Sequence, residues 1–331
     1  MIKGVNLGGW FVLESWMRQS LFKGVSSHDE TGFMIKHDNP YEAIKSHYET
    51  WIAKDDFIWL KNHGIESIRL PIPWWLEGET PYQNSVSYIK RALTWADEIG
   101  LSVMLDLHTA PGCQNGFDNG GIEGQMDWHK DPKNIILTIE KLGFIARELA
   151  SFKSVFAIEV LNEPHGSINL EIIKEFYIRS YHEIRKYTNK QVVFHDAFRP
   201  NDESWIDFFQ NKEFKNVGFD LHLYHCFDER LIAGDINTHI HEIIDRRLPL
   251  IQRLMKLTNV YIGEWSLGIR TDQMKKDSDF DLHRFERLLA DLQLYTYSHA
   301  TGYYFWSYRI EAEGRHGWYF KALVEDGTLN I

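Results

Sequence analysis

The chain has 331 residues, of which 44% are hydrophobic, and its formal net charge is −11. This length and hydrophobic fraction are sufficient for one large core or two ordinary ones. The acidic charge argues against a nucleic acid as partner, because nucleic-acid binding depends on basic patches that displace counterions. Aromatic residues make up 14% of the chain, more than a core usually requires, and spare aromatic side chains often form platforms for sugars or bases. A neutral substrate therefore fits the composition better than a polyanion.

The sequence contains no run of about 18 apolar residues, so we expect no membrane-spanning segment and no membrane partner. Residues 2–7 have the pattern of a core strand and not that of a secretory signal, which favours a cytoplasmic protein. Cys113 and Cys226 are too few for a disulfide framework. Each follows a predicted strand, but we expect no structural bond between them. Nothing in the sequence indicates an oligomeric state.

Apolar runs of strand length recur along the chain and alternate with stretches of helical spacing. The predicted strands are 2–7, 65–70, 102–107, 155–161, 191–195, 217–224, 259–264 and 302–307. The predicted helices are 49–63, 86–99, 134–150, 170–187, 203–210, 237–257 and 281–299. Strands that are almost continuously apolar and alternate with helices are typical of a parallel sheet covered by helices.

This alternation of strands and helices predicts a closed (β/α)8 TIM barrel of the α/β class. No linker, charge run or internal repeat divides the chain, so we expect residues 1–331 to form a single domain. A doubly wound sheet is the weaker alternative, because Gly4, Gly8 and Gly9 lack the spacing of a dinucleotide-binding loop. Barrel active sites are built from the loops that follow strands. The longest segments without helical spacing are 8–48, 71–83, 109–133 and 225–236.

Almost every predicted strand ends in a group that can hydrogen-bond, titrate or stack. These groups are Asn6, Arg69, Asp106, His108, Asn162, Glu163, His195, Asp196, His222, Tyr224, Glu264, Trp265 and Trp306. Solvation of the loops requires far fewer such residues, and their concentration is typical of a barrel active site. Taken singly, Arg69 is as readily a salt-bridge partner, His108 a core histidine and Trp306 a packing residue. We treat Asp106 as structural.

Glu163 and Glu264 stand out because each ends a buried apolar strand and is followed by a structure breaker or an aromatic residue. Paired carboxyl groups suit glycoside hydrolysis, in which one protonates the leaving oxygen and the other attacks the anomeric carbon or activates water. The permanent charge of Arg69 can hold one carboxylate ionised, while partial burial raises the pKa of the other. Trp306 can form an apolar floor for a sugar ring.

A metal site is the main rival among enzymes, since His108, His165, His222 and His225 could supply ligands. The first strand offers no His-x-His pair, however, and the spacing of His222 and His225 does not place both on one face of a strand. A nucleophilic triad is disfavoured because the sequence has no Gly-x-Ser-x-Gly motif and no cysteine that starts a helix. We therefore expect neither a metal nor a cofactor.

Short motifs distributed over nearly the whole chain carry a family resemblance. They are Gly4–Glu14, Ile68–Ile72, Asp106–Asn119, Leu161–Pro164, His222–Tyr224, Gly263–Trp265 and Phe305–Ser307. In this order they resemble glycoside hydrolase family 5 of clan A, and within it the exo-β-1,3-glucanase and β-glucosidase group known from yeasts. The resemblance implies a retaining double displacement with Glu163 as general acid/base and Glu264 as nucleophile.

The same resemblance implies supporting roles around the two carboxyl groups. Asn162 would hydrogen-bond the 2-hydroxyl of the sugar, where contacts strengthen at the transition state. Arg69, His222 and Tyr224 would orient Glu264 and stabilise its charge.

The resemblance also implies which residues form the substrate pocket. His108 would line the same subsite, with Trp306 as its floor. Glu14 and Asp118 would hold hydroxyls of the terminal glucose and close the pocket for exo action.

Phe117 and Phe227 match an aromatic pair that clamps the next sugar at the entrance of the yeast-type enzymes. The chain departs from the yeast pattern at His225 and Cys226, and again at 309–316. Both loops should face the incoming substrate, so the resemblance leaves linkage and aglycone preference open.

The resemblance thus implies a retaining β-glucosidase or exo-β-glucanase that hydrolyses terminal β-linked glucose, mainly β-1,3-linked, from oligosaccharides or glucosides. Cleavage within longer β-glucans is the alternative if the loops at 109–133 and 225–236 leave a groove. A catalytically inactive sugar-binding barrel is a second alternative, which the intact carboxyl pair and its supporting groups disfavour. The leader and paired cysteines of the secreted fungal proteins are missing, so we expect no cell-wall role.

Overall fold

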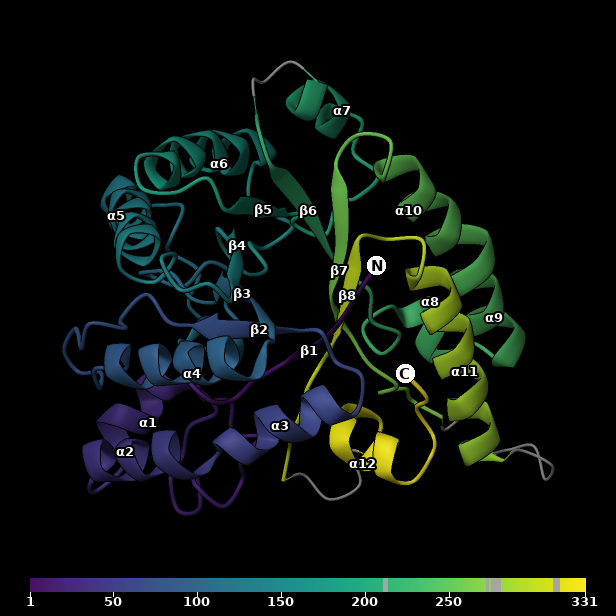
Figure 1. Cartoon of the computed structure of the whole chain (residues 1–331), viewed down its shortest axis with the longest axis horizontal. Helices are drawn as coiled ribbons and strands as arrows, with labels where there is room; N and C mark the ends of the chain where they lie inside the picture. Colours follow the sequence, from purple (N-terminus) through teal and green to yellow (C-terminus); the bar gives the residue numbers. More distant parts are fainter. Residues whose placement is uncertain (211–213, 272–273, 275–280, 312–315) are drawn as a thin grey trace.

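The computed structural model describes residues 1–210, 214–271, 274, 281–311 and 316–331. Within them, parallel strands close into one barrel, in which each strand pairs with its neighbours in the sequence and β8 pairs with β1. The strands are β1 (Ile2–Asn6), β2 (Ser67–Ile72), β3 (Ser102–Leu107), β4 (Val155–Glu159), β5 (Gln191–His195), β6 (Val217–His222), β7 (Asn259–Trp265) and β8 (Gly302–Phe305). The predicted (β/α)8 TIM barrel is confirmed, and Figure 1 shows the helices around its outside.

Five predicted helices are present, with ends within a few residues of the prediction. They are α4 (Val86–Ile99), α5 (Pro132–Glu148), α6 (Leu170–Arg185), α7 (Ser204–Gln210) and α11 (Leu282–Tyr297). α5 begins earlier than predicted because the side chain of Asp131 accepts a hydrogen bond from the backbone N–H of Lys133. Pro132 occupies the first turn of this helix, where a missing N–H leaves no bond unmade.

The segment between β1 and β2 contradicts the prediction. It contains α1 (Glu30–Lys36), α2 (Pro40–Thr50) and α3 (Lys54–Asn62). The predicted loop at 8–48 therefore holds two helices, and the predicted helix at 49–63 is interrupted. The interruption is stabilised by Asp56, whose carboxylate accepts a hydrogen bond at 2.9 Å from the backbone N–H of Ala53 at the start of α3.

The predicted helix at 237–257 is instead three successive elements. They are α9 (Ile236–His241), the π-helix η2 (Glu242–Arg247) and α10 (Leu248–Leu254). Short elements that the sequence did not predict are α8 (Glu229–Ile232), α12 (Phe320–Glu325) and the 3-10 turns η1 (Asp118–Gly120) and η4 (His316–Trp318). Among the described residues, the helices are too short or too polar to cross a membrane. Cys113 and Cys226 are both free, as predicted.

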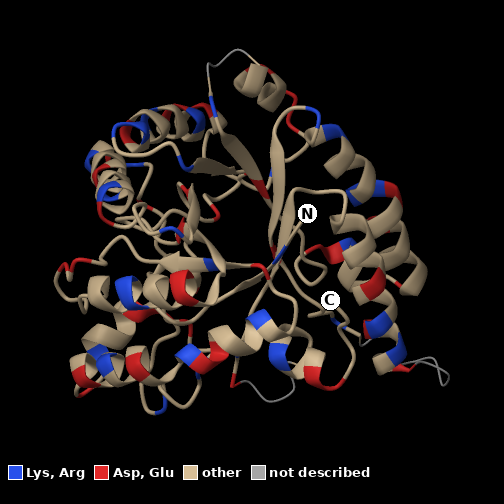
Figure 2. Cartoon of the chain, in the orientation of Figure 1, with Lys and Arg blue, Asp and Glu red and all other residues tan. Residues whose placement is uncertain are grey.

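The interior of the barrel has an apolar layer and a charged layer. The apolar cluster enclosed by the strands consists of Met104, Ala157, Val193, Tyr261 and Tyr304. Because inward side chains alternate along a strand, the next inward positions toward the carboxyl ends are Asp106, Glu159 and His195. Most other charged residues belong to the outer helices and loops (Figure 2). The charged layer of the barrel is therefore an exception that needs a functional or structural reason.

Glu30 ties the helical segment before β2 to the barrel loops. It is fully buried at the start of α1, where Oε2 accepts from the N–H of Leu13 at 2.9 Å and Oε1 accepts from Nε1 of Trp75 at 3.0 Å. Burial raises the pKa of Glu30 to about 8, although both hydrogen bonds oppose the rise. The folded protein therefore prefers Glu30 protonated, whereas the unfolded chain ionises it at an ordinary pKa.

This difference predicts that the Glu30→Gln variant loses part of the pH dependence of stability. Between the unfolded pKa and about pH 8 the folded state binds more protons, so stability falls as pH rises, by up to about 1.4 kcal/mol per pH unit. Urea unfolding at pH 5, 6, 7 and 8 should show a shallower decline for the variant than for the wild type. Glu49→Gln, at an exposed position of α2, should follow the wild-type slope. Parallel curves for Glu30→Gln and the wild type would contradict the prediction.

Candidate active site

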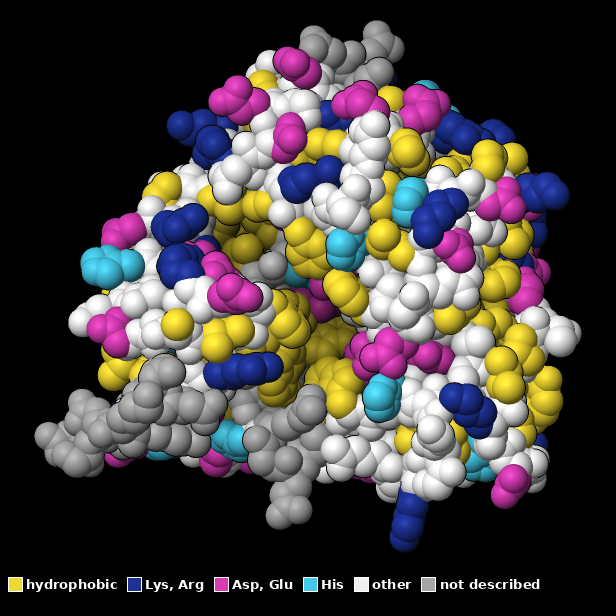
Figure 3. Space-filling view, turned by 180° about the vertical axis from the view of Figure 1, so that it is seen from behind, with side chains coloured by type: hydrophobic (Ala, Val, Ile, Leu, Met, Phe, Trp, Pro, Cys, Tyr) yellow, Lys and Arg dark blue, Asp and Glu magenta, His cyan; other side chains and the backbone are white. Residues whose placement is uncertain are grey.

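A cavity of about 940 Å³ lies at the carboxyl ends of the barrel strands. Of the residues predicted for the site, those that line it are Glu14, Phe117, Asp118, Glu163, Tyr224, Phe227, Glu264 and Trp306. The others, Arg69, His108, Asn162 and His222, are buried next to its walls. The hollow in the middle of the face in Figure 3 has hydrophobic side chains on its walls and acidic and histidine side chains beside them. All the predicted site residues thus lie in or next to one cavity.

The fully buried Arg69 side chain connects much of the charged layer. Its donated hydrogen bonds and ion pairs go to Glu264 Oε1 at 2.9 Å, Asn6 Oδ1 at 3.1 Å, Asn162 Oδ1 at 2.8 Å, Asp106 Oδ2 at 3.1 Å and Glu159 Oε2 at 2.7 Å. Burial alone would lower the pKa of Arg69, but the charges of Asp106, Glu159 and Glu264 raise it well above its ordinary value. The guanidinium therefore remains charged and fixes several side chains at once.

Glu264 reaches the interior through an irregularity in β7. The pairing register shifts between Ile262 and Trp265, so the simple alternation of side chains does not hold there. Gly263 leaves room for the neighbouring Asp220, because a Cβ at this position would lie 1.9 Å from Asp220 Oδ2. The glycine N–H also donates to Asp220 Oδ1 at 2.5 Å. This local geometry directs the Glu264 side chain toward the cavity.

Both oxygens of Glu264 accept from strong donors. Arg69 Nη1 donates to Oε1 at 2.9 Å, and the hydroxyl of Tyr224 donates to Oε2 at 2.7 Å. Burial and the charge of Glu163 raise the pKa of Glu264, while the charges of His222 and Arg69 oppose this rise.

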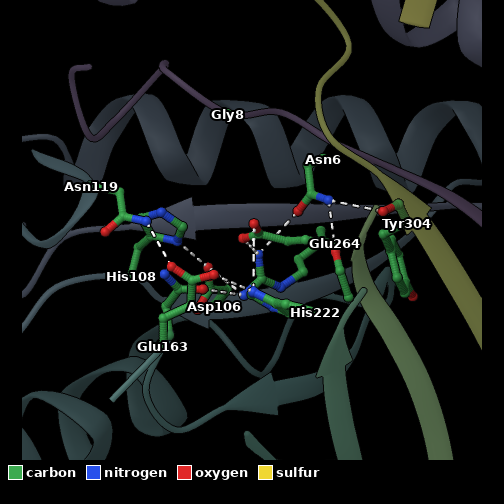
Figure 4. A network of polar contacts seen from close by, with 12 residues as sticks. Asn6, Gly8, Asp106, His108, Asn119, Glu163, His222, Glu264 and Tyr304 are labelled. Carbon is green, nitrogen blue, oxygen red and sulfur yellow. Dashed lines mark hydrogen bonds and ion pairs between the residues drawn. The ribbon is translucent and has the colours of Figure 1, made fainter. Parts of the chain in front are cut away.

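Glu163 lies directly opposite a histidine and an amide. His222 Nδ1 lies 2.7 Å from Oε1, and Asn119 Nδ2 donates to Oε2 at 2.8 Å (Figure 4). The backbone of Glu163 has a φ of 43°, in the left-handed region that non-glycine residues rarely adopt. Burial would raise the pKa of Glu163, but the hydrogen bond and charge of His222 and the Asn119 bond lower it below the ordinary value.

His222 has a carboxylate at each ring nitrogen. Besides the contact to Glu163, Nε2 lies 3.3 Å from Asp220 Oδ2, and Nδ1 lies 3.5 Å from Glu264 Oε2. Burial would lower the pKa of His222, but the charges of Glu264 and Asp220 raise it well above its ordinary value. The sequence placed His222 beside Glu264, whereas its shortest contact in the structure is to Glu163.

Three buried polar atoms near the cavity have no hydrogen-bond partner among the described residues. They are Asn162 Nδ2, His108 Nε2 and Glu14 Oε1. The other polar atom of each side chain has a partner. Arg69 donates to Asn162 Oδ1, and Asp106 lies 2.6 Å from His108 Nδ1. Trp16 Nε1 donates to Glu14 Oε2 at 2.8 Å. Buried polar atoms without partners are costly, so these three atoms beside the cavity are available to a bound ligand or to water. His108 also stacks on Trp306, with ring centroids 5.5 Å apart and planes at 5°.

The cavity entrance carries exposed aromatic side chains. Phe117 is 40% exposed and packs edge-on against His165, while Phe227 is 74% exposed and packs edge-on against Tyr224. Phe198 also lines the cavity and is 41% exposed, but the sequence did not single it out. The loop at 309–316, where the chain departs from the yeast pattern, lies partly outside the described residues.

Comparison with known proteins identifies the family. A family model described as cellulase (glycosyl hydrolase family 5) matches residues 28–309. The chain belongs to glycosyl hydrolase family 5. The glucan 1,3-beta-glucosidase of Blumeria graminis is 31% identical over 99% of this chain and 86% of its own length. The protein of the same name from Schwanniomyces occidentalis is 36% identical over 72% of this chain and 60% of its own length. This family 5 protein is therefore a glycoside hydrolase with a carbohydrate substrate.

Solved structures agree with the barrel fold. The rutinosidase from Aspergillus niger superposes with a TM-score of 0.84 at 19% identity, covering 98% of this chain and 97% of its own. The endoglucanase Cel5A from Thermotoga maritima superposes with a TM-score of 0.62 at 15% identity, covering 98% and 96%. At these identities the likeness concerns the fold alone.

Sequence reasoning missed three residues that contact the carboxyl pair or its support in this family 5 enzyme. Glu159 and Asp220 lie inside β4 and β6, and Asn119 lies in η1. A charged residue in an otherwise apolar strand could have been recognised from the sequence as a candidate site residue. Asp220 lies two positions before His222, a spacing that places both side chains on the same face of a strand. Asn119 gave no such signal, because its position depends on the course of a long loop.

The described residues include two groups with metal-ligand spacing, Glu163 with His195 and His222, and Glu159 with Asp220 and His222. Of the predicted candidates, His222 belongs to both groups, whereas His108, His165 and His225 belong to neither. The site of this family 5 enzyme already uses both nitrogens of His222 in contacts to carboxylates. His195 Nδ1 accepts from the N–H of Ala197 at 2.9 Å.

Arg69→Met should destabilise the enzyme strongly, because it leaves Glu159, Asp106 and Glu264 buried without their shared cation. The expected loss is about 3–5 kcal/mol of unfolding free energy, together with activity. Urea unfolding followed by tryptophan fluorescence measures it. Arg179→Met, at an exposed position of α6, should change stability by less than about 0.5 kcal/mol. Equal stability of both variants would contradict the central role of Arg69.

Proposed function

We propose that this family 5 enzyme hydrolyses terminal β-linked glucose, mainly β-1,3-linked, from oligosaccharides or glucosides with retention of configuration. The observation that carries the proposal is the position of His222 Nδ1, 2.7 Å from Glu163 Oε1 and 3.5 Å from Glu264 Oε2. Laid end to end, these two distances place the two oxygens at most 6.2 Å apart. Retaining glycosidases hold their carboxyl groups about 5–5.5 Å apart and inverting ones about 6.5–9.5 Å. The short separation supports retention.

In the first step, the Glu264 carboxylate attacks the anomeric carbon while Glu163 protonates the departing glycosidic oxygen. A covalent glycosyl ester forms on Glu264 and the aglycone leaves with the proton. In the second step, Glu163 removes a proton from water, the water oxygen attacks the anomeric carbon, and the bond to Glu264 breaks. Each carboxyl group ends the cycle in its starting form.

The pKa directions in the free enzyme favour a proton on Glu264 over one on Glu163, whereas the first step needs the proton on Glu163 and an ionised Glu264. The side chains that contact the two glutamates explain how the proton reaches Glu163. Arg69 and Tyr224 donate directly to Glu264 and support its ionised form. Glu163 instead faces His222, whose Nδ1 proton can cross a 2.7 Å hydrogen bond to Oε1 without movement of heavy atoms. Exclusion of water by bound sugar favours the neutral pair, so Glu163 receives its proton when substrate binds.

The buried polar atoms without protein partners support sugar binding between the carboxyl pair and the Trp306 ring. Asn162 Nδ2 is suited to donate to a hydroxyl oxygen. His108 carries its ring proton on Nδ1, facing Asp106, so its Nε2 is suited to accept from a hydroxyl group, as is Glu14 Oε1. Because the other end of each side chain is already fixed, these groups need little reorganisation when a sugar binds. Trp306 supplies an apolar face for the ring.

The preference for glucose and β-1,3 links rests on the printed function of the relatives, which are glucan 1,3-beta-glucosidases. Exo action is supported by a partition of Trp16, Asp118 and Glu123, which borders the catalytic cavity on one side and a second cavity of about 840 Å³ on the other. The second cavity also favours one alternative, cleavage within longer β-glucans whose non-reducing end extends past the partition. We further propose a cytoplasmic location, which the free thiols of Cys113 and Cys226 support.

Glu163→Gln and Glu264→Gln should fold normally and each lose at least about a thousandfold in kcat on a β-glucoside with a poor leaving group. Circular dichroism and initial rates test this expectation. Near-normal activity in either variant would overturn the assignment of the carboxyl pair.

The two roles are separated by a substrate whose leaving group needs no proton. With 2,4-dinitrophenyl β-glucoside, Glu163→Gln should still form the glycosyl-enzyme and show a burst of released phenol, because only the second step needs the base. Glu264→Gln should show no burst, because it lacks the nucleophile. A burst from Glu264→Gln alone would reverse the roles.

Product analysis distinguishes exo from internal cleavage. Laminari-oligosaccharides should release glucose as the first product, with the β-anomer appearing first in proton NMR because configuration is retained. Early release of disaccharides or longer products would favour the alternative, and a first α-anomer would exclude retention. Parallel reactions with gentio- and cello-oligosaccharides measure the preference among linkages.

A further inference from the structure

A buried arginine on the outer helical layer reaches the loop that carries Tyr224. Arg247 is the last residue of the π-helix η2, and it is only 4% exposed. Its Nη2 donates to the carbonyl oxygen of Tyr224 at 2.6 Å, and its Nη1 donates to the carbonyl oxygen of Leu223 at 3.0 Å. Nη1 also lies 2.9 Å from His225 Nε2. One guanidinium therefore holds three consecutive residues of the loop after β6.

The irregular helix presents this arginine to the loop while its neighbour points outward. The Arg246 side chain is 64% exposed and forms an ion pair with Glu242 Oε2, whereas the Arg247 side chain is 5% exposed. Arg247 Nε also lies 3.3 Å from Glu242 Oε1. A π-helix alters which face successive residues occupy, and such turns are frequent at functional sites. Arg247 is thus buried against the loop, while the adjacent Arg246 lies in solvent and can serve as a control position for mutation.

The loop contact fixes the protonation of two buried histidines. Because a guanidinium only donates, His225 Nε2 must accept, and the proton of His225 lies on Nδ1. This proton is donated to His239 Nδ1 at 2.9 Å. Burial also lowers the pKa of His239 to about 4, so both rings are neutral near pH 7. His225 thereby joins the loop to α9.

A second arm of the same network reaches the strand that carries Glu264. Arg247 Nη1 also lies 3.0 Å from the hydroxyl of Tyr297, so its two N–H groups are shared among three acceptors. The Tyr297 hydroxyl donates to Gln293 Oε1 at 3.0 Å. Gln293 Nε2 donates in turn to the carbonyl oxygen of Ser266 at 3.4 Å, near the end of β7. Arg247 thus braces both the β6 loop and the segment after Glu264.

We propose that Arg247 is a positioning residue, which holds the backbone of Tyr224 so that the Tyr224 hydroxyl donates to Glu264 at 2.7 Å. The inference rests on the proposed role of Glu264 as nucleophile. Loss of the arginine removes the donors to the carbonyl oxygens of Leu223 and Tyr224 and frees the loop, so the hydroxyl no longer stays on Glu264 Oε2. Arg247 touches no reacting atom and acts only through Tyr224.

A double-mutant cycle of Tyr224→Phe and Arg247→Met tests this coupling. Each single variant should lower kcat on an aryl β-glucoside by about 10- to 100-fold, because one hydrogen bond to a charged group is lost. KM should change by less than about threefold, because the hydrogen bond lost is to Glu264 and not to the sugar. The double variant should be no slower than the slower single variant, because both changes remove the same bond.

The acidic limb of kcat/KM against pH supplies a readout that a purely structural role would not move. A donor to Glu264 favours its ionised form, so loss of the Tyr224 hydrogen bond raises the pKa of Glu264. Both Tyr224→Phe and Arg247→Met should therefore shift the acidic limb to higher pH by the same amount. Arg247→Lys, which can still donate to one or two carbonyl oxygens, should recover part of the rate and of the shift.

Arg246→Met is the control, since it alters the neighbouring residue of the same π-helix and should leave kcat and the pH profile unchanged. If Arg247→Met does not fold, Tyr297→Phe removes one acceptor from the network and should give a smaller loss of kcat that is also non-additive with Tyr224→Phe. Multiplicative losses in the double variant, or a normal kcat and pH profile in a folded Arg247 or Tyr297 variant, would overturn the proposal. Full activity of Glu264→Gln would instead overturn the proposed function.

Discussion

The charge of Arg69 is the interaction on which the rest of the site depends. A single buried cation faces Asp106, Glu159 and Glu264 directly, with Asp220 3.9 Å away. Arg69 and His222, whose pKa is also raised, supply fewer positive charges than these four carboxylates and Glu163 carry, so protons must be shared among them in an interior of low dielectric constant. Burial raises the pKa of Glu159 well above its ordinary value, although the charge of Arg69 opposes the rise. The barrel interior thus sets both the positions and the charge states of the groups above it.

The proton transfer proposed for the carboxyl pair depends on the unequal partners that this layer supplies. Glu264 has a permanent cation and a phenol as donors, and neither Arg69 nor Tyr224 readily gives up a proton. Glu163 has His222, which can hold or release a proton, and Asp220 on the far side of the ring supports the protonated form. Two glutamates of the same intrinsic acidity are therefore suited to different tasks, and the difference lies in the residues behind them.

The sequence predicts those features of the site that depend on local residue patterns. It does not predict the features that depend on contacts between residues far apart in the chain. The apolar strands and the polar groups at their ends follow from residue periodicity, and these place Glu163 and Glu264 at one cavity. Periodicity alone would not turn Glu264 inward, because its direction depends on the irregular register of β7 near Gly263. The sequence missed the helices within 30–50 and the contact of His222 to Glu163 for a similar reason. Caps, short elements and cross-barrel contacts between distant residues have no simple sequence pattern.

In the proposed function, substrate selection depends on a different part of the chain from bond cleavage. The partition between the two cavities is attached to the segment between β1 and α1. The Glu123 carboxylate accepts from His28 Nδ1 at 2.8 Å, and the Glu123 N–H donates to Asp29 Oδ2 at 2.9 Å. These contacts join two loops and involve none of the strands that carry the carboxyl pair. The loop after β6 is held separately by Arg247. Changes in either loop can therefore alter which sugar or aglycone fits the cavity, while Arg69 keeps the carboxyl pair in the same geometry.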